Sequence, residues 1–159
     1  MRSPLRPARR AALIGLIAIL GGTARAPGPG PMAVHDAWTR PTAVGMNGAG
    51  YLTIKNQTGL NDRLLRAGSP AATSVTLHES RMASGVMIMR PLSELAVPAG
   101  ATVALVPGGR HLMLSGLHGP LKLGRRVPVD LVFAHAGRLR VYLTVRLGPP
   151  GDSMAGMKM

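Results

Sequence analysis

Histidine and methionine residues recur in this sequence at a spacing that places them on one face of a β-strand. His111 and Met113 lie two residues apart in an apolar run, and Met87 and Met89 repeat this spacing in another. Successive side chains of a strand point to opposite faces, so residues two apart point the same way. His78 lies at the end of a third run. Three strands could therefore bring two imidazoles and several thioethers to one place.

Imidazole and thioether donors select a soft ion of low charge. The sulfur of methionine is neutral and polarisable, so it binds Mg²⁺ and Ca²⁺ poorly and Cu(I) well. Structural zinc sites use Cys and His, and a blue-copper electron-transfer site needs a Cys thiolate. The sequence has no cysteine. These residue types therefore favour Cu(I) binding without electron transfer.

Each of these residues, taken singly, also has an ordinary explanation. Methionine commonly fills gaps in cores, and lone histidines are common on surfaces. We leave His35, His118 and His135 with that explanation, whereas Met46, in a Gly-rich loop, either packs or faces solvent. Taken jointly, four residues are harder to explain as incidental and are the candidate metal ligands: His78, Met89, His111 and Met113.

Short runs rich in Val, Leu, Ile and Thr, separated by turn signals, predict an all-β domain that starts near Met32. Gly and Pro in the separators favour turns, and no later segment has a long helical period. Nine short strands suggest two packed antiparallel sheets, so we expect a single Greek-key β-sandwich. The predicted strands cover residues 33–38, 49–56, 62–69, 74–79, 85–90, 101–106, 111–117, 127–133 and 138–146.

The net charge of +13 raises the question of nucleic-acid binding. Five of the 19 basic residues lie in the first 26 positions, and the remaining 14 against 6 acidic residues leave +8. Those 14 are scattered, and only 3% of the residues are aromatic and able to stack on bases. The sequence therefore speaks against a nucleic-acid partner.

The N-terminus has the layout of an export signal. Four arginines precede an apolar run over residues 11–20, and a small-x-small cleavage box follows at residues 24–26. The run is short for a membrane span, which needs about 20 residues. Pro27 would hinder cleavage, which leaves an uncleaved N-terminal anchor open as the one membrane contact. The expected organisation is a signal over residues 1–26, a Pro/Gly spacer over 27–31, the domain over 32–147 and a flexible Met-containing tail over 148–159.

The four candidate ligands also carry a family resemblance. Their spacing is H-x10-M-x21-H-x-M, the copper motif of the PCuAC family. The surrounding residues resemble this family from about residue 33 to 146, notably at residues 85–91 and 107–114. A motif this long with fixed spacing is far more specific than a short Gly-rich match.

The resemblance implies a cupredoxin-like β-sandwich in the periplasm of a Gram-negative-type bacterium. It also implies one Cu(I) per chain, held by His78, Met89, His111 and Met113 and passed to a respiratory oxidase. The implied recipient is the CuA centre of cytochrome c oxidase subunit II, with a Sco-like assembly protein as co-worker or alternative recipient. Met82 and Met87 match no ligand position and are interpreted as packing residues or weak auxiliaries. Met154, Met157 and Met159 in the tail support at most a weak second Cu(I) site.

Two other functions remain open from the sequence. A periplasmic scavenging or resistance protein would need the same copper ligands. A non-metal β-sandwich that binds a partner protein would make the His and Met positions incidental. An enzyme is not expected, because there is no Cys nucleophile, Asp and Glu total six, and no Ser-His-acid arrangement stands out.

Overall fold

The computed structural model describes residues 30–151, which form ten β-strands and no helix. No helix that is long and apolar enough to cross a membrane is therefore found among these residues. The export signal, most of the spacer and most of the tail lie outside the described residues. The strands are β1 (Met32–Thr39), β2 (Gly48–Asn56), β3 (Asp62–Gly68), β4 (Ala72–Ala83), β5 (Val86–Leu92), β6 (Leu95–Val97), β7 (Thr102–Leu105), β8 (Arg110–Leu117), β9 (Arg126–Phe133) and β10 (Gly137–Val145).

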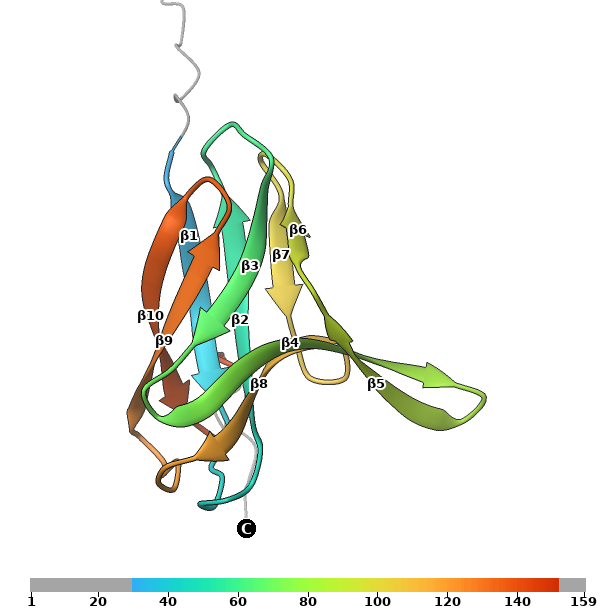
Figure 1. Cartoon of the computed structure of the whole chain (residues 1–159), viewed down its shortest axis with the longest axis vertical. Coiled ribbons are helices and arrows are strands. Elements are labelled where there is room, and N and C mark those ends of the chain that lie inside the picture. Colours follow the sequence, from blue (N-terminus) through green and yellow to red (C-terminus); the bar gives the residue numbers. More distant parts are fainter. Residues whose placement is uncertain (1–29, 152–159) are drawn as a thin grey trace, which may run out of the picture.

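The strands form one hydrogen-bonded path in the order β5-β4-β8-β2-β1-β10-β9-β3-β6, with β7 paired to β2 (Figure 1). Pairing of Ala67 in β3 with Val75 in β4 closes seven strands of this path into a barrel. Most strand edges are therefore paired, which removes the exposed backbone that open sheets present. The predicted all-β class is confirmed.

Three details of the strand prediction are wrong. The three-residue strand β6 was not predicted, because one short run gives too little alternation to recognise. Strand β4 continues to Ala83, well past the predicted end at residue 79, because β5 pairs with it from Leu77 to Ala83. The strands are also not all antiparallel, since β1 pairs in parallel with β10 at Trp38–Thr144 and Thr39–Val145.

Aliphatic side chains make up most of the core. Strand β9 shows the pattern, with buried Val127, Val129, Leu131 and Phe133 alternating with less buried residues. Such alternation buries one face of each strand and leaves the other face free for solvent or ligands. The low aromatic content is therefore compatible with a continuous core.

Asn56 is a fully buried polar residue at the end of β2. Its Nδ2 donates to the carbonyl oxygens of Leu60 (2.7 Å) and Val97 (2.8 Å). Its Oδ1 accepts from the backbone N–H (3.0 Å) and the hydroxyl (2.7 Å) of Thr58. One side chain thus holds the loop after β2 against β6, with its buried polar atoms satisfied.

Asp62, at the start of β3, joins that strand to the turn between β9 and β10. Its carboxylate accepts from the backbone N–H groups of His135 (2.9 Å), Ala136 (2.8 Å) and Arg63 (2.7 Å). Burial alone would raise the pKa of Asp62, but these N–H groups outweigh it and hold the pKa below its ordinary value. The carboxylate is therefore in its charged form at neutral pH.

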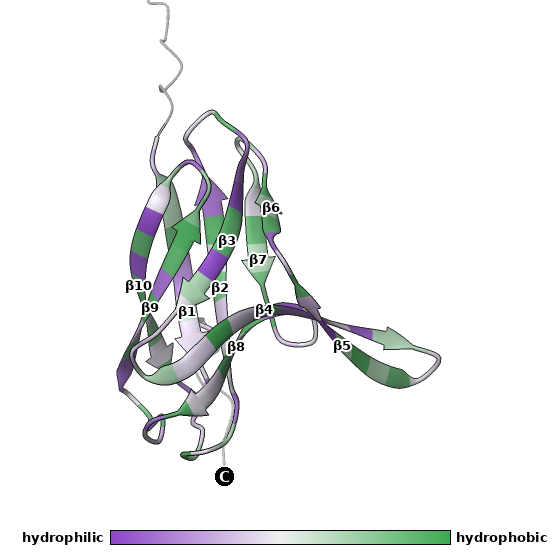
Figure 2. Ribbon diagram, in the orientation of Figure 1, coloured by the Kyte–Doolittle hydropathy of each residue, from purple (hydrophilic) through white to green (hydrophobic). Residues whose placement is uncertain are grey.

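The hairpin of β4 and β5 projects away from the barrel (Figure 1). Seven consecutive pairs join the two strands, from Leu77–Leu92 to Ala83–Val86. Ser84 and Gly85, with φ of 50° and 77°, form a two-residue turn whose positive φ values suit the twist of a hairpin. Apolar residues continue along this projecting hairpin (Figure 2). We call its residues 80–89 the outer hairpin.

Candidate metal centre

The two candidate histidines lie directly opposite each other on neighbouring strands. His78 of β4 pairs with His111 of β8, and opposed residues of an antiparallel pair share a face. Their imidazole rings are nearly parallel, at 21°, with 6.0 Å between centroids. The register thus brings together two residues that are 33 positions apart in the sequence.

The two candidate methionines flank this pair on the same face. Met113 of β8 lies opposite Thr76, two residues from His78, and Met89 of β5 lies opposite Ser80, two residues beyond His78. Both methionines are therefore diagonal neighbours of His78, a separation that long side chains can span. All four predicted residues lie on one face of the three strands β5, β4 and β8.

Hydrogen bonds at Nδ1 orient both imidazole rings. The Nδ1 of His111 lies 3.1 Å from the carbonyl oxygen of Gly109, which can only accept, so this nitrogen carries the proton. The Nδ1 of His78 lies 3.3 Å from the hydroxyl of Thr76. In neutral His111 the Nε2 lone pair is consequently free for a metal, the arrangement seen in many metal-binding histidines.

Exposure increases across the site from β8 to β5. His111 is only 5% exposed and lies beside Tyr51, with 6.5 Å between ring centroids, while His78 and Met113 are half-buried. Met89 is 48% exposed. One imidazole is thus fixed by the barrel, and one thioether is open to an incoming molecule.

An ionic triad on the opposite face links the three strands directly behind the site. Glu79 accepts from Arg90 of β5 at 3.1 Å and from Arg110 of β8 at 3.4 Å. The hydrogen bond from Arg90 lowers the pKa of Glu79, partial burial raises it and Arg110 lowers it again, which leaves it below its ordinary value. Each member of the triad is the sequence neighbour of His78, Met89 or His111. The sequence analysis missed the triad, because only the cross-strand register brings its members together.

Changing Glu79 to Gln should loosen the hairpin without unfolding the barrel. The amide leaves two guanidinium groups facing each other without a carboxylate, and an exposed ion pair is worth only a modest amount. Backbone amides of β5 should exchange hydrogen about two- to fivefold faster, while those of β9 should be unchanged. Because the pKa of Glu79 is lowered in the folded protein, its stabilising contact should be fully present above the ordinary glutamate pKa and be lost as the pH falls through the lowered pKa.

The matched control for this change is Glu94→Gln, which removes the Arg63–Glu94 ion pair away from the hairpin. It should leave β5 exchange unaltered. Equal β5 exchange rates in wild type and Glu79→Gln would show that the triad does not hold the hairpin.

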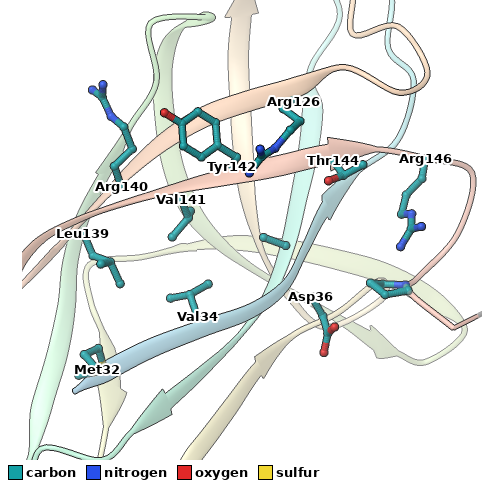
Figure 3. Close-up of a pocket in the computed structure, with 12 residues that line it drawn as sticks. Met32, Val34, Asp36, Arg126, Leu139, Arg140, Val141, Tyr142, Thr144 and Arg146 are labelled. Atoms are coloured by element: carbon teal, nitrogen blue, oxygen red, sulfur yellow. The ribbon is translucent and has the colours of Figure 1, made fainter. Parts of the chain in front are cut away.

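A hollow elsewhere on the molecule holds none of the candidate ligands. It has a volume of about 480 Å³ and lies between β1 and β10, where Figure 3 shows Arg126, Tyr142 and Arg146 around it. Strand β1 pairs with β10 only at Trp38 and Thr39, and the hollow lies beside the part of β1 that does not pair with β10. The candidate site is therefore an open sheet face and is separate from this hollow.

Carboxylates do not take part in the candidate site. Across residues 30–151 no three or more His, Cys, Asp and Glu side chains gather closely enough to hold a metal ion. The donors that do gather are two imidazoles and two thioethers. Such a set has the softness that Cu(I) requires.

Comparison with solved structures defines the class of the fold. The "Copper-bound PCuAC domain from PmoF2" matches with a TM-score of 0.63 and 22% identity, over 76% of this chain and 97% of that one. The "Solution structure of CuI-DR1885 from Deinococcus radiodurans" matches with a TM-score of 0.51 and 33% identity, over 69% of this chain and 76% of that one. The fold is that of PCuAC domains, which confirms the predicted cupredoxin-like class and the predicted resemblance.

A family model identifies the chain more closely. The family described as "Putative lipoprotein LpqE-like" matches residues 32–145, and the chain belongs to this family. A relative from Leifsonia xyli subsp. xyli (strain CTCB07), "Putative lipoprotein Lxx21020", is 34% identical over 137 residues, which cover 84% of this chain and 82% of the relative.

Proposed function

We propose that this protein is an exported copper chaperone that holds one Cu(I) through His78, Met89, His111 and Met113 and passes it to another protein. The observation that carries the proposal is the gathering of two imidazoles and two thioethers on one sheet face, by the register of β5, β4 and β8. Two structural neighbours, one named as copper-bound and one as a Cu(I) form, support the choice of metal.

The charge of the donors favours binding that remains reversible. All four donors are neutral when they bind, so the site adds no thiolate that would hold copper by charge. The guanidinium groups of Arg90 and Arg110 are paired with Glu79 on the opposite face. Cu(I) is therefore held by donor softness, which a recipient with similar donors can match.

The gradient of exposure suggests the order of ligand exchange. Met89 is the most exposed donor and lies on the projecting hairpin, whereas His111 is buried and fixed. A donor of the recipient protein could replace the Met89 sulfur first, while the two imidazoles still hold the ion. Transfer would then proceed without releasing free Cu(I), and copper would remain Cu(I) throughout.

We place this protein in the periplasm and its recipient in a respiratory oxidase. The sequence has an export-signal layout, and its family and relative carry the name lipoprotein, which also implies export. These 159 residues contain no cysteine that could carry a thioether-linked lipid. We therefore infer export from the name lipoprotein, but not lipid attachment. The CuA centre of cytochrome c oxidase subunit II, reached directly or through a Sco-like protein, is the recipient that the PCuAC resemblance implies.

The binding part of the proposal is tested by titrating the full chain anaerobically with Cu(I) against a chromogenic chelator. One tight equivalent is expected, with an X-ray absorption spectrum that contains both nitrogen and sulfur scatterers. Failure to compete with the chelator, or a first shell without sulfur, would contradict the proposal.

The delivery part needs a separate experiment. Deleting the gene should lower oxidase activity, and added copper should restore that activity. A copper-sensitive strain with normal oxidase activity would instead assign the protein to scavenging.

A further inference from the structure

Two methionines outside the proposed ligand set are exposed on the outer hairpin. Met82 is 62% exposed and Met87 is 52% exposed, so neither packs into the core as gap-filling methionines do. Val86 and Ile88 beside them are exposed as well. A projecting, solvent-facing hairpin with this composition calls for an explanation other than stability.

The register of the hairpin makes Met82 and Met87 a cross-strand pair. They are directly opposed in β4 and β5, where Cβ atoms are typically about 4.5–5.5 Å apart. One residue separates Met82 from Ser84, and one separates Met87 from Gly85. The backbone geometry of the Ser84–Gly85 turn fixes this register. This register allows the two thioethers to reach one ion.

The pair also lies on the same face as the proposed copper site. Residues two apart on a strand share a face, so Met87 follows Met89, and Met82 follows the Ser80 that opposes Met89. Met89 therefore lies between His78 and the pair Met82 and Met87, which we call the tip pair. The charged residues of the hairpin, Glu79, Arg81 and Arg90, alternate onto the other face. From tip to barrel, this face offers two thioethers, then a third, then the imidazoles.

We propose that Met82 and Met87 form a thioether-only docking position for Cu(I) at the tip of the hairpin, from which the ion passes through Met89 to the four-ligand site. This inference rests on the proposed function. Two or three thioethers without an imidazole bind a soft ion more weakly than the full set, so the ion moves inward on loading. Each new Cu–S bond replaces an older bond or a carrier's donor, and no electron is transferred.

The equilibrium test uses the full chain labelled with ¹³C at its methionine methyl groups. One equivalent of Cu(I) is added to fill the four-ligand site, followed by Ag(I) as a redox-inert soft ion. The methyl signals of Met82 and Met87 should shift on the second addition, whereas that of Met46, which is exposed in the loop before β2, should not. A second addition that leaves the Met82 and Met87 signals unchanged would overturn the docking position.

The kinetic test compares Met82→Leu/Met87→Leu with Met46→Leu as the matched control. Leucine keeps the apolar surface and removes the sulfur. The double variant should take up Cu(I) from a soluble chelate about five- to tenfold more slowly, with the affinity of the four-ligand site changed less than twofold. Equal uptake rates in the double variant, the control and wild type would overturn the proposal.

These outcomes separate this inference from the proposed function. If wild type binds no tight equivalent, the chaperone proposal fails, whatever the tip pair does. If the tight equivalent is present but the methyl shifts and rate change are absent, the tip pair alone is wrong. Normal uptake in the leucine variant, combined with slow transfer to a protein in Met82→Ser/Met87→Ser, would reassign the hairpin to apolar docking of a partner protein.

Discussion

Replacing His111 with alanine should lower the affinity for Cu(I) about a hundredfold or more. Loss of groups that merely orient a metal ligand typically costs 10- to 100-fold, and His111 is itself a proposed ligand. It is also the donor most firmly fixed, because it is buried and its Nδ1 is bound to the carbonyl of Gly109. The other donors cannot replace it, since each lies at its own position in the register. The measurement is a competition titration with a Cu(I) chelator.

Two further variants make this result interpretable. His118→Ala removes an exposed histidine just beyond the end of β8 and should leave the affinity unchanged. Because truncating buried His111 could disturb packing, His78→Ala is the second test, since His78 is half-buried and its loss leaves the core intact. Retention of wild-type affinity in both His111→Ala and His78→Ala would show that the two imidazoles are not ligands of Cu(I).

Replacing Asn56 with alanine should lower the free energy of unfolding by about 2–4 kcal/mol. The change removes four hydrogen bonds at a fully buried position and leaves the carbonyl oxygens of Leu60 and Val97 without this donor. Water cannot replace the side chain fully, because the position is closed to solvent. Urea denaturation of the metal-free chain measures the change.

The control for this change is Asn47→Ala, an exposed asparagine just before β2. It should shift the unfolding free energy by less than about 0.5 kcal/mol, as surface substitutions usually do. The two variants losing equal stability would mean that the Asn56 contacts are replaced by water or by backbone rearrangement.

Local periodicity was enough to predict much of the fold. The alternation of apolar residues in β9 and the positions of Gly and Pro located most strands, because side-chain direction along a strand depends only on near neighbours. Strand β6 was missed, because three residues carry almost no pattern. The parallel contact between β1 and β10 joins the two ends of the domain, and no local rule predicts such a contact.

In the candidate site, too, the features within one strand could be predicted and the features that depend on contacts between strands could not. That His111 and Met113 share a face follows from their spacing within one strand. That His78 opposes His111, and that Glu79 bridges Arg90 and Arg110 behind them, depends on the register between strands. The exposure of Met82 and Met87 could not be predicted either, because the sequence does not show that β4 and β5 leave the barrel together.

The outer hairpin and the closed barrel differ in how strongly folding constrains their sequences. The pair that closes the barrel, Ala67 and Val75, involves no residue of the outer hairpin, and Asn56 and Asp62 stabilise the barrel from elsewhere. Substitutions of the exposed side chains of the outer hairpin, Met82 and Met87 among them, should therefore cost little in folding, while substitutions at buried positions of the barrel should cost much. Natural variation can therefore change the surface chemistry of the hairpin without the chain having to find a new way to fold.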